Sequence, residues 1–181
     1  MRPAVQRGFT LIEILVAVFV IVMVASVVML NLNSPARDRM AEQNAQSLAN
    51  MLNYALDEAE FSAQAYGLFV WRNLGRDESI DLEFRRLDEG LWRRVEDEVL
   101  SASLVFDSPL ELRVRSEGGL VELEVKPEDE TQLRPVFWLW PSGEMSVGKI
   151  EIRDPVSPSE EDWMVSWTLF GQAQATLGEP E

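Results

Sequence analysis

The sequence contains no cysteine and no histidine, and lysine occurs at only two positions, Lys126 and Lys149. Without cysteine the chain forms neither a disulfide nor a thiolate nucleophile. Without histidine it lacks the commonest general base and the commonest zinc ligand, which excludes Ser-His and Cys-His catalytic arrangements. These absences therefore disfavour an enzyme.

Positive charge is also scarce, because 16 Lys and Arg residues stand against 31 Asp and Glu residues, a formal net charge of -15 at pH 7. The acidity is not confined to one tail but is spread from Asp57 to Glu181. A surface of this sign repels the phosphates of nucleic acids. We therefore expect no nucleic-acid partner.

The acidic clusters raise the question of a metal site or of paired catalytic carboxylates. Calcium loops place their acids at the spacing D-x-D-x-D-G, and this sequence contains no such spacing. Two carboxylates could hydrolyse a glycosidic bond, but runs such as Glu96-Asp97-Glu98 are typical of solvated turns. We expect no catalytic residue, no metal ligand and no cofactor.

One long apolar run is present, over residues 9–32, and no charged residue occurs between Ile14 and Ala36. As a helix, the run is long enough for a hydrocarbon core of roughly 30 Å. It exceeds the roughly 7–15 apolar residues of a secretory signal peptide, which predicts a retained transmembrane helix. Basic residues flank the run on both sides and give a small preference for a cytoplasmic N-terminus.

Glu13 is the one charged residue inside the apolar run. At the bilayer centre a carboxylate costs roughly 2.5–3.5 kcal/mol, and less near a helix end. One interpretation places Glu13 at the interface, where its side chain reaches water. The other gives it a positive partner inside an assembly of helices.

The segment "RGFTLIE", Arg7 to Glu13, resembles the class III signal of type IV pilin-like proteins. The resemblance implies that a leader of residues 1–8 is removed by a prepilin peptidase between Gly8 and Phe9, and that Phe9 is then N-methylated. It further implies that Glu13 neutralises the terminal amine of a neighbouring subunit when the apolar helices pack into a filament.

Beyond the apolar run, Pro35 predicts a pause in the helix, because proline lacks a backbone donor. Apolar residues then recur at spacings of three and four, which predicts an amphipathic helix over residues 33–67 that ends near Gly67. Packing of its apolar stripe against a sheet is the interpretation that we favour.

From residue 68 the apolar period becomes two, which predicts a β-rich domain over residues 68–181, continuous with the helix 33–67. The fold class is α+β: one long N-terminal helix, with a membrane half and an amphipathic half, on an antiparallel sheet. Residues 84–104 are ambiguous, and residues 171–181 read as a frayed tail. We expect strands over residues 67–73, 79–87, 110–116, 120–125, 136–140, 146–153 and 163–171.

Two further segments, Leu48 to Val70 and Phe137 to Ile152, resemble H-type minor pseudopilins of type II secretion. The J type is of similar length and stays an alternative. Minor pilins of type IV pili share the domain, but many carry a cysteine pair that is absent here. An unrelated signal-anchored periplasmic enzyme is the third alternative.

The H-type resemblance implies a subunit of the pseudopilus tip complex, held in the bacterial inner membrane by one span with its C-terminal domain in the periplasm. The implied partners are the other minor pseudopilins, the major pseudopilin, the prepilin peptidase and the inner-membrane assembly platform.

Overall fold

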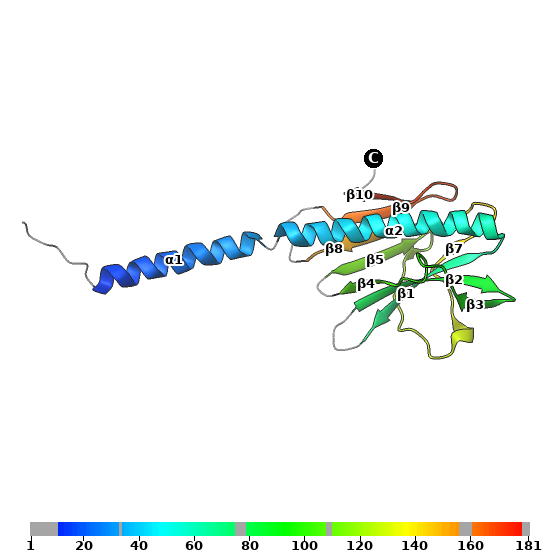
Figure 1. Ribbon diagram of the computed structural model, residues 1–181, viewed down its shortest axis with the longest axis horizontal. Coiled ribbons are helices and arrows are strands. Elements are labelled where there is room, and N and C mark those ends of the chain that lie inside the picture. The colour runs from blue at the N-terminus through cyan, green and yellow to red at the C-terminus, as the bar shows by residue number, and fades with distance from the viewer. Residues whose placement is uncertain (1–10, 33, 75–78, 108–109, 156–160, 179–181) are drawn as a thin grey trace, which may run out of the picture.

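The computed structural model describes residues 11–32, 34–74, 79–107, 110–155 and 161–178, with backbone alone for residues 25, 27–32 and 34–38. Two helices follow one another along the chain, α1 (Leu11–Leu32) and α2 (Ser34–Ser62). Figure 1 shows α1 projecting away from the domain and α2 lying across it. The predicted combination of a long N-terminal helix with antiparallel sheet is confirmed.

Helix α2 buries one apolar stripe and leaves polar residues on its other face. Ala45, Leu48 and Leu52, at spacings of three and four, are fully buried against the domain. Pro35 is the second residue of α2, where its missing N–H is not needed by the helix. The stripe therefore contributes to the core as the periodicity predicted.

Helix α2 ends at Ser62, so the predicted end near Gly67 is wrong. Ala63 adopts a left-handed backbone conformation with φ 55°, and the N–H of Gln64 donates to the carbonyl of Ala59 at 3.3 Å. These features close a helix C-terminus. Gly67 lies inside a buried strand, where an added Cβ would approach Pro135 Cβ to 2.7 Å. Its lack of a side chain therefore permits close packing.

In the described residues, ten strands form two antiparallel five-stranded sheets. Sheet A has the order β3-β2-β1-β7, and β4 also pairs with β2. Its strands are β1 (Tyr66–Asn73), β2 (Ser79–Asp88), β3 (Leu91–Arg94), β4 (Leu104–Asp107) and β7 (Phe137–Leu139). The ambiguous residues 84–104 thus contain the end of β2, all of β3 and the first residue of β4.

Sheet B has the order β10-β9-β8-β5-β6. Its strands are β5 (Glu111–Ser116), β6 (Gly119–Leu120), β8 (Gly148–Arg153), β9 (Trp163–Trp167) and β10 (Gln174–Leu177). A short 3-10 helix, η1 (Glu130–Gln132), lies in the connection between the two sheets.

The predicted frayed tail over residues 171–181 is wrong where it contains β10. Two hydrogen bonds attach the start of this segment to α2. Asn53 Nδ2 donates to the carbonyl of Ala173 at 3.0 Å, and the N–H of Ala173 donates to Asn53 Oδ1 at 2.7 Å. This long-range amide contact positions β10 beside β9, and sequence spacing alone does not reveal it.

The predicted strand over residues 120–125 is also wrong, since β6 ends at Leu120. The segment instead divides its backbone hydrogen bonds between the sheets. The N–H of Val121 donates to Val114 in sheet B at 2.8 Å, and the carbonyl of Glu124 accepts from Arg72 in sheet A at 2.9 Å. The alternating apolar residues of this segment therefore lie in a connection that runs from sheet B to sheet A, and not in a strand.

The main core lies between α2 and the two sheets, and a smaller aromatic cluster lies on the other face of sheet A. In this cluster the rings of Phe69 and Trp92 meet edge to face with centroids 5.3 Å apart. Trp138 is half-buried against Trp92, and Trp140 stacks on Trp138 at 6.1 Å. Contacts within the domain therefore cover part of the rings of Trp138 and Trp140.

Candidate functional site

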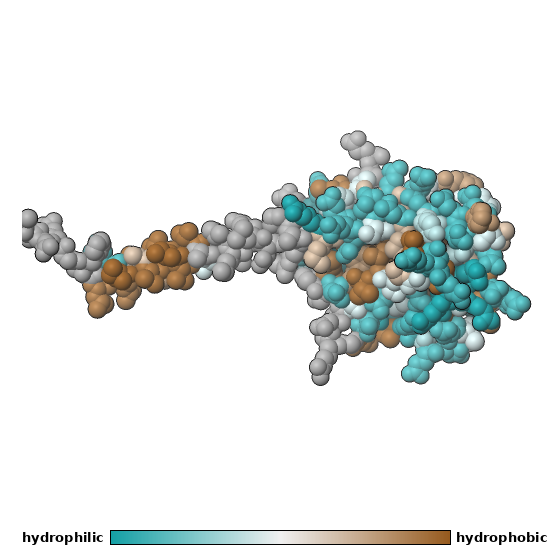
Figure 2. Space-filling view, in the orientation of Figure 1, coloured by the Kyte–Doolittle hydropathy of each residue, from teal (hydrophilic) through white to brown (hydrophobic). Residues whose placement is uncertain are grey.

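Helix α1 exposes an apolar surface to its surroundings. Every side chain from Leu11 to Val24 is exposed, and Leu11 retains 83% of its accessible area. Figure 2 shows this apolar surface in brown beyond the hydrophilic domain. A helix that is apolar all round is normally covered, by lipid or by other helices. The helix therefore requires a partner that the folded domain does not supply.

The membrane helix predicted over residues 9–32 starts outside the described residues. Among those that the structure describes, no helix is both long enough and apolar enough to cross a membrane.

Glu13 lies in the first turn of α1 with an exposed side chain. Its neighbours Ile12 and Ile14 expose 67% and 53% of their area, so the carboxylate emerges from an apolar surface. The positive end of the helix dipole favours a negative charge at this position. The predicted processing residues Gly8 and Phe9 lie outside the described residues.

A second polar side chain of α1 belongs to Ser26. Its hydroxyl donates to the carbonyl of Val22 at 2.8 Å, which satisfies it within the helix. Ser26 therefore does not prevent α1 from packing in an apolar environment.

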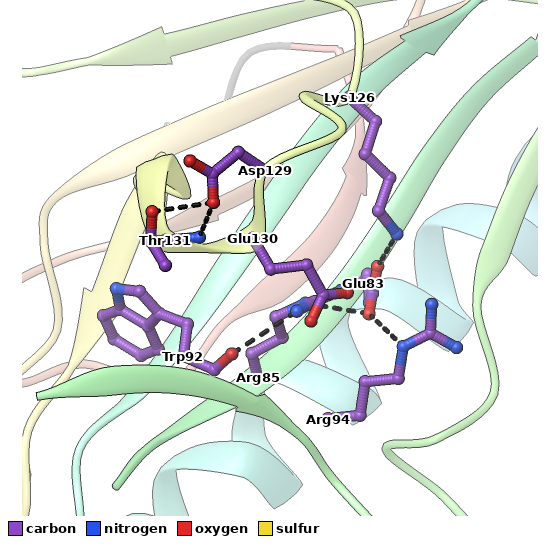
Figure 3. Close-up of polar contacts among 8 residues, drawn as sticks. All are labelled: Glu83, Arg85, Trp92, Arg94, Lys126, Asp129, Glu130 and Thr131. Carbon is purple, nitrogen blue, oxygen red and sulfur yellow. Dashed lines mark hydrogen bonds and ion pairs between the residues drawn. The ribbon is translucent and has the colours of Figure 1, made fainter. Parts of the chain in front are cut away.

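A second polar site lies on the outer face of sheet A, around Arg85 (Figure 3). The strand alternation predicts that Arg85 points to solvent, but its side chain is fully buried. Its Nε lies 2.9 Å from Glu83 Oε1, and its Nη2 lies 3.2 Å from Glu130 Oε1. Its Nη1 donates to the carbonyl of Trp92 at 3.4 Å. Sequence reasoning missed this residue because the segment that covers it comes from far along the chain.

The carboxylate of Glu83 gathers further cations. Lys126 Nζ lies 2.6 Å from Glu83 Oε2, and Arg94 Nε lies 3.8 Å from Glu83 Oε1. Figure 3 shows Lys126 and Arg94 approaching this carboxylate from different strands and loops. The pKa of Glu130 lies below its usual value. The hydrogen bond from Arg85 is the largest cause, and the positive charge of Arg85 lowers the pKa further. Glu130 therefore stays ionised opposite the buried guanidinium.

Asp129 organises the turn that carries Glu130. Its Oδ1 accepts from the backbone N–H of Thr131 at 2.9 Å and from the Thr131 hydroxyl at 2.7 Å. Both hydrogen bonds lower the pKa of Asp129, and the one from the Thr131 hydroxyl has the larger effect. The connection between the sheets is thus fixed by Lys126, by Glu130 and by the buried Leu133.

Asp97 fixes a second connection, the turn that follows β3. Its Oδ1 accepts from the N–H groups of Val99 at 2.8 Å and Leu100 at 3.0 Å, and Tyr54 of α2 donates to its Oδ2 at 3.0 Å. The backbone hydrogen bond from Leu100 is the largest cause of the lowered pKa of Asp97. In the described residues, no group of three or more acidic side chains could hold a metal ion.

We expect Asp97→Asn to remove a pH-dependent contribution to stability. Because the folded pKa of Asp97 is lowered, its contribution is complete above the ordinary value of about 3.9 and is lost as the pH falls through the folded pKa. Urea unfolding of the wild-type protein and of Asp97→Asn, measured between pH 7 and pH 3, should show a difference in unfolding free energy that shrinks below about pH 4. A difference that is independent of pH would contradict this assignment.

Comparison with known proteins finds one family model and two solved structures. The family model of the prokaryotic N-terminal methylation motif matches residues 4–29. A solved structure of the minor pseudopilin EpsH from the Type 2 Secretion System of Vibrio cholerae is 20% identical with a TM-score of 0.60. The match covers 78% of this chain and 97% of the EpsH chain. No curated protein matches this chain.

A crystal structure of the same Vibrio cholerae pseudopilin is 21% identical with a TM-score of 0.58. It covers 78% of this chain and 94% of its own. At these identities the likeness establishes the fold, which is that of a pilin-like protein. It agrees with the H-type resemblance of the two sequence segments.

Proposed function

We propose that the protein is an H-type minor pseudopilin, a subunit in or beside the tip complex that starts assembly of a type II secretion pseudopilus. The observation that carries the proposal is α1: an exposed apolar helix with one carboxylate, Glu13, in its first turn. The methylation motif over residues 4–29 and the pilin-like domain that follows support it.

In this proposal a prepilin peptidase cuts between Gly8 and Phe9 and N-methylates Phe9. The new terminus is a cation that must leave water when α1 packs among other helices. A buried cation without a partner is strongly destabilising, whereas a paired one is tolerated. Glu13 of a neighbouring subunit supplies the opposite charge, so charge pairing fixes the stagger of the helices.

Before assembly, α1 holds the protein in the inner membrane, with the N-terminus in the cytoplasm and the C-terminal domain in the periplasm. The partners are the other minor pseudopilins, the major pseudopilin and the inner-membrane assembly platform. The task is mechanical: the growing pseudopilus moves folded proteins towards the outer membrane, and the subunit itself catalyses no reaction.

The first test is the intact mass of the membrane-extracted protein, made in cells with and without the prepilin peptidase. We expect the loss of residues 1–8 and one added methyl group on Phe9 when the peptidase is present. In cells without the peptidase the chain should keep its leader and no methyl group. An intact Met1 in both strains, or a cut beyond Leu30, would contradict the proposal.

A further inference from the structure

A cavity of about 240 Å³ opens at the edge of β2, where sheet A is interrupted. The pairing of β2 with β3 ends at Arg85, and its pairing with β4 ends at Leu82. The two residues between them, Glu83 and Phe84, line the cavity. The chain from β3 to β4 loops out beside this gap, so the cavity is built by the strand register.

The polar wall of the cavity is formed by Glu83, Arg94 and Lys126. Glu83 Oε2 is already bound by Lys126 at 2.6 Å, and its Oε1 is bound by the buried Arg85 at 2.9 Å. Arg94 is much less engaged, since its Nε lies 3.8 Å from Glu83, beyond hydrogen-bond length, and its side chain is 71% exposed. Its guanidinium therefore keeps donors for another acceptor.

The local charge is opposite to that of the whole chain. Of the residues that line the cavity, Arg94 and Lys126 carry two positive charges and Glu83 carries one negative charge. The chain as a whole carries a net charge of -15. At physiological salt, charges farther than about 8 Å are largely screened, so the distant part of the acidic surface has little effect on a ligand in the cavity.

We propose that the cavity binds a carboxylate side chain from an acidic residue of a protein partner, with Arg94 and Lys126 as its donors. A planar carboxylate fits the guanidinium fork of Arg94. The apolar walls, formed by Phe84, Val95 and Leu100, accommodate the methylene groups of a glutamate and its neighbours. This site goes beyond the assembly helix and does not depend on processing of the N-terminus.

A protein partner fits better than a lipid phosphate because of where the cavity lies. Figure 1 shows β3 at the end of the domain away from α1. Helix α1 is the apolar element that we assign to the membrane, so a headgroup would lie at the other end of the molecule. The net negative charge also disfavours polyanions, which favours a single acidic residue in an otherwise neutral segment.

The test is an NMR titration of the ¹⁵N-labelled full chain in detergent micelles with the blocked tripeptide acetyl-Ala-Glu-Ala-amide. We expect saturable shifts at Ser101, Ser103 and the Arg94 Nε–H group, which line the cavity, with a dissociation constant on the order of 1 mM. The glutamine analogue of the peptide should not bind. The side-chain resonance of Arg94 is identified by its absence from the Arg94→Gln spectrum.

Arg94→Gln should weaken binding of the tripeptide about tenfold, the usual effect of losing a charged hydrogen bond. The matched control is Arg113→Gln, which removes the same charge from an exposed position on sheet B and should bind normally. Circular dichroism checks that both variants are folded. An equal loss in both variants overturns the proposal. So does equal binding of the glutamine analogue, or equal binding of glycerol phosphate, which would assign the cavity to a phosphate.

Discussion

Replacing Arg85 by alanine is expected to destabilise the domain by about 3 kcal/mol, because it leaves a cavity and unpaired polar groups in a buried site. The Trp92 carbonyl loses a donor in this buried site, whereas the Glu130 side chain is 57% exposed and can accept from water instead. The expected cost is at the lower end for a buried ion pair, since Lys126 and Arg94 still neutralise Glu83. Urea unfolding, followed by tryptophan fluorescence, measures the change in the free energy of unfolding.

Two further variants separate charge from volume at this site. Arg85→Met fills most of the space without donating hydrogen bonds, so it should recover part of the lost stability. Arg113→Ala removes an exposed arginine of sheet B and should change stability by no more than about 0.5 kcal/mol. A cost below about 1 kcal/mol for Arg85→Ala would mean that water replaces the contacts of the guanidinium.

The burial of Arg85 illustrates what sequence patterns do not contain. Within β2 the alternation of Leu82, Glu83 and Phe84 predicts one apolar face and one solvated face. The solvated face is in fact covered by the connection that carries Glu130 and Leu133. Nothing in the local sequence of β2 reveals a cover that comes from more than 40 residues away.

The elements themselves were predictable because their signals are local. Ala45, Leu48 and Leu52 of α2 recur at the helical period, and all three are buried. The errors lie where a distant partner decides the outcome. Asn53 attaches Ala173 and so allows β10 to form, and Arg72 captures the carbonyl of Glu124 and so ends the expected strand.

The candidate site divides in the same way. Glu13 was singled out from the sequence because a lone carboxylate in an apolar run is a local anomaly; the structure places it in an exposed first turn, and its role in assembly stays a prediction. The cavity beside Glu83 was not predicted, because it arises from the register of three strands. Local chemistry is readable from sequence, whereas sites built by strand register need the fold.

Replacing Glu13 by alanine should abolish most of the assembly activity of the subunit while leaving its domain folded. If Glu13 pairs with the terminal amine of a neighbour, its loss leaves a buried cation without a partner, at a cost of about 3–5 kcal/mol. Each 1.4 kcal/mol is a tenfold change, so incorporation should fall at least about 100-fold. Secretion of a folded reporter and cross-linking of the subunit to its neighbours measure the effect.

The controls for Glu13→Ala distinguish assembly from membrane insertion and folding. The variant removes a charge from an apolar helix, so the amount of protein in the inner membrane should stay the same or rise. Glu42→Ala removes an exposed carboxylate from α2 and should secrete normally. Glu13→Gln keeps a hydrogen-bond acceptor without the charge, so a defect equal to that of alanine identifies the charge as the essential property. Normal secretion by Glu13→Ala would instead assign Glu13 to the membrane interface, where its side chain reaches water.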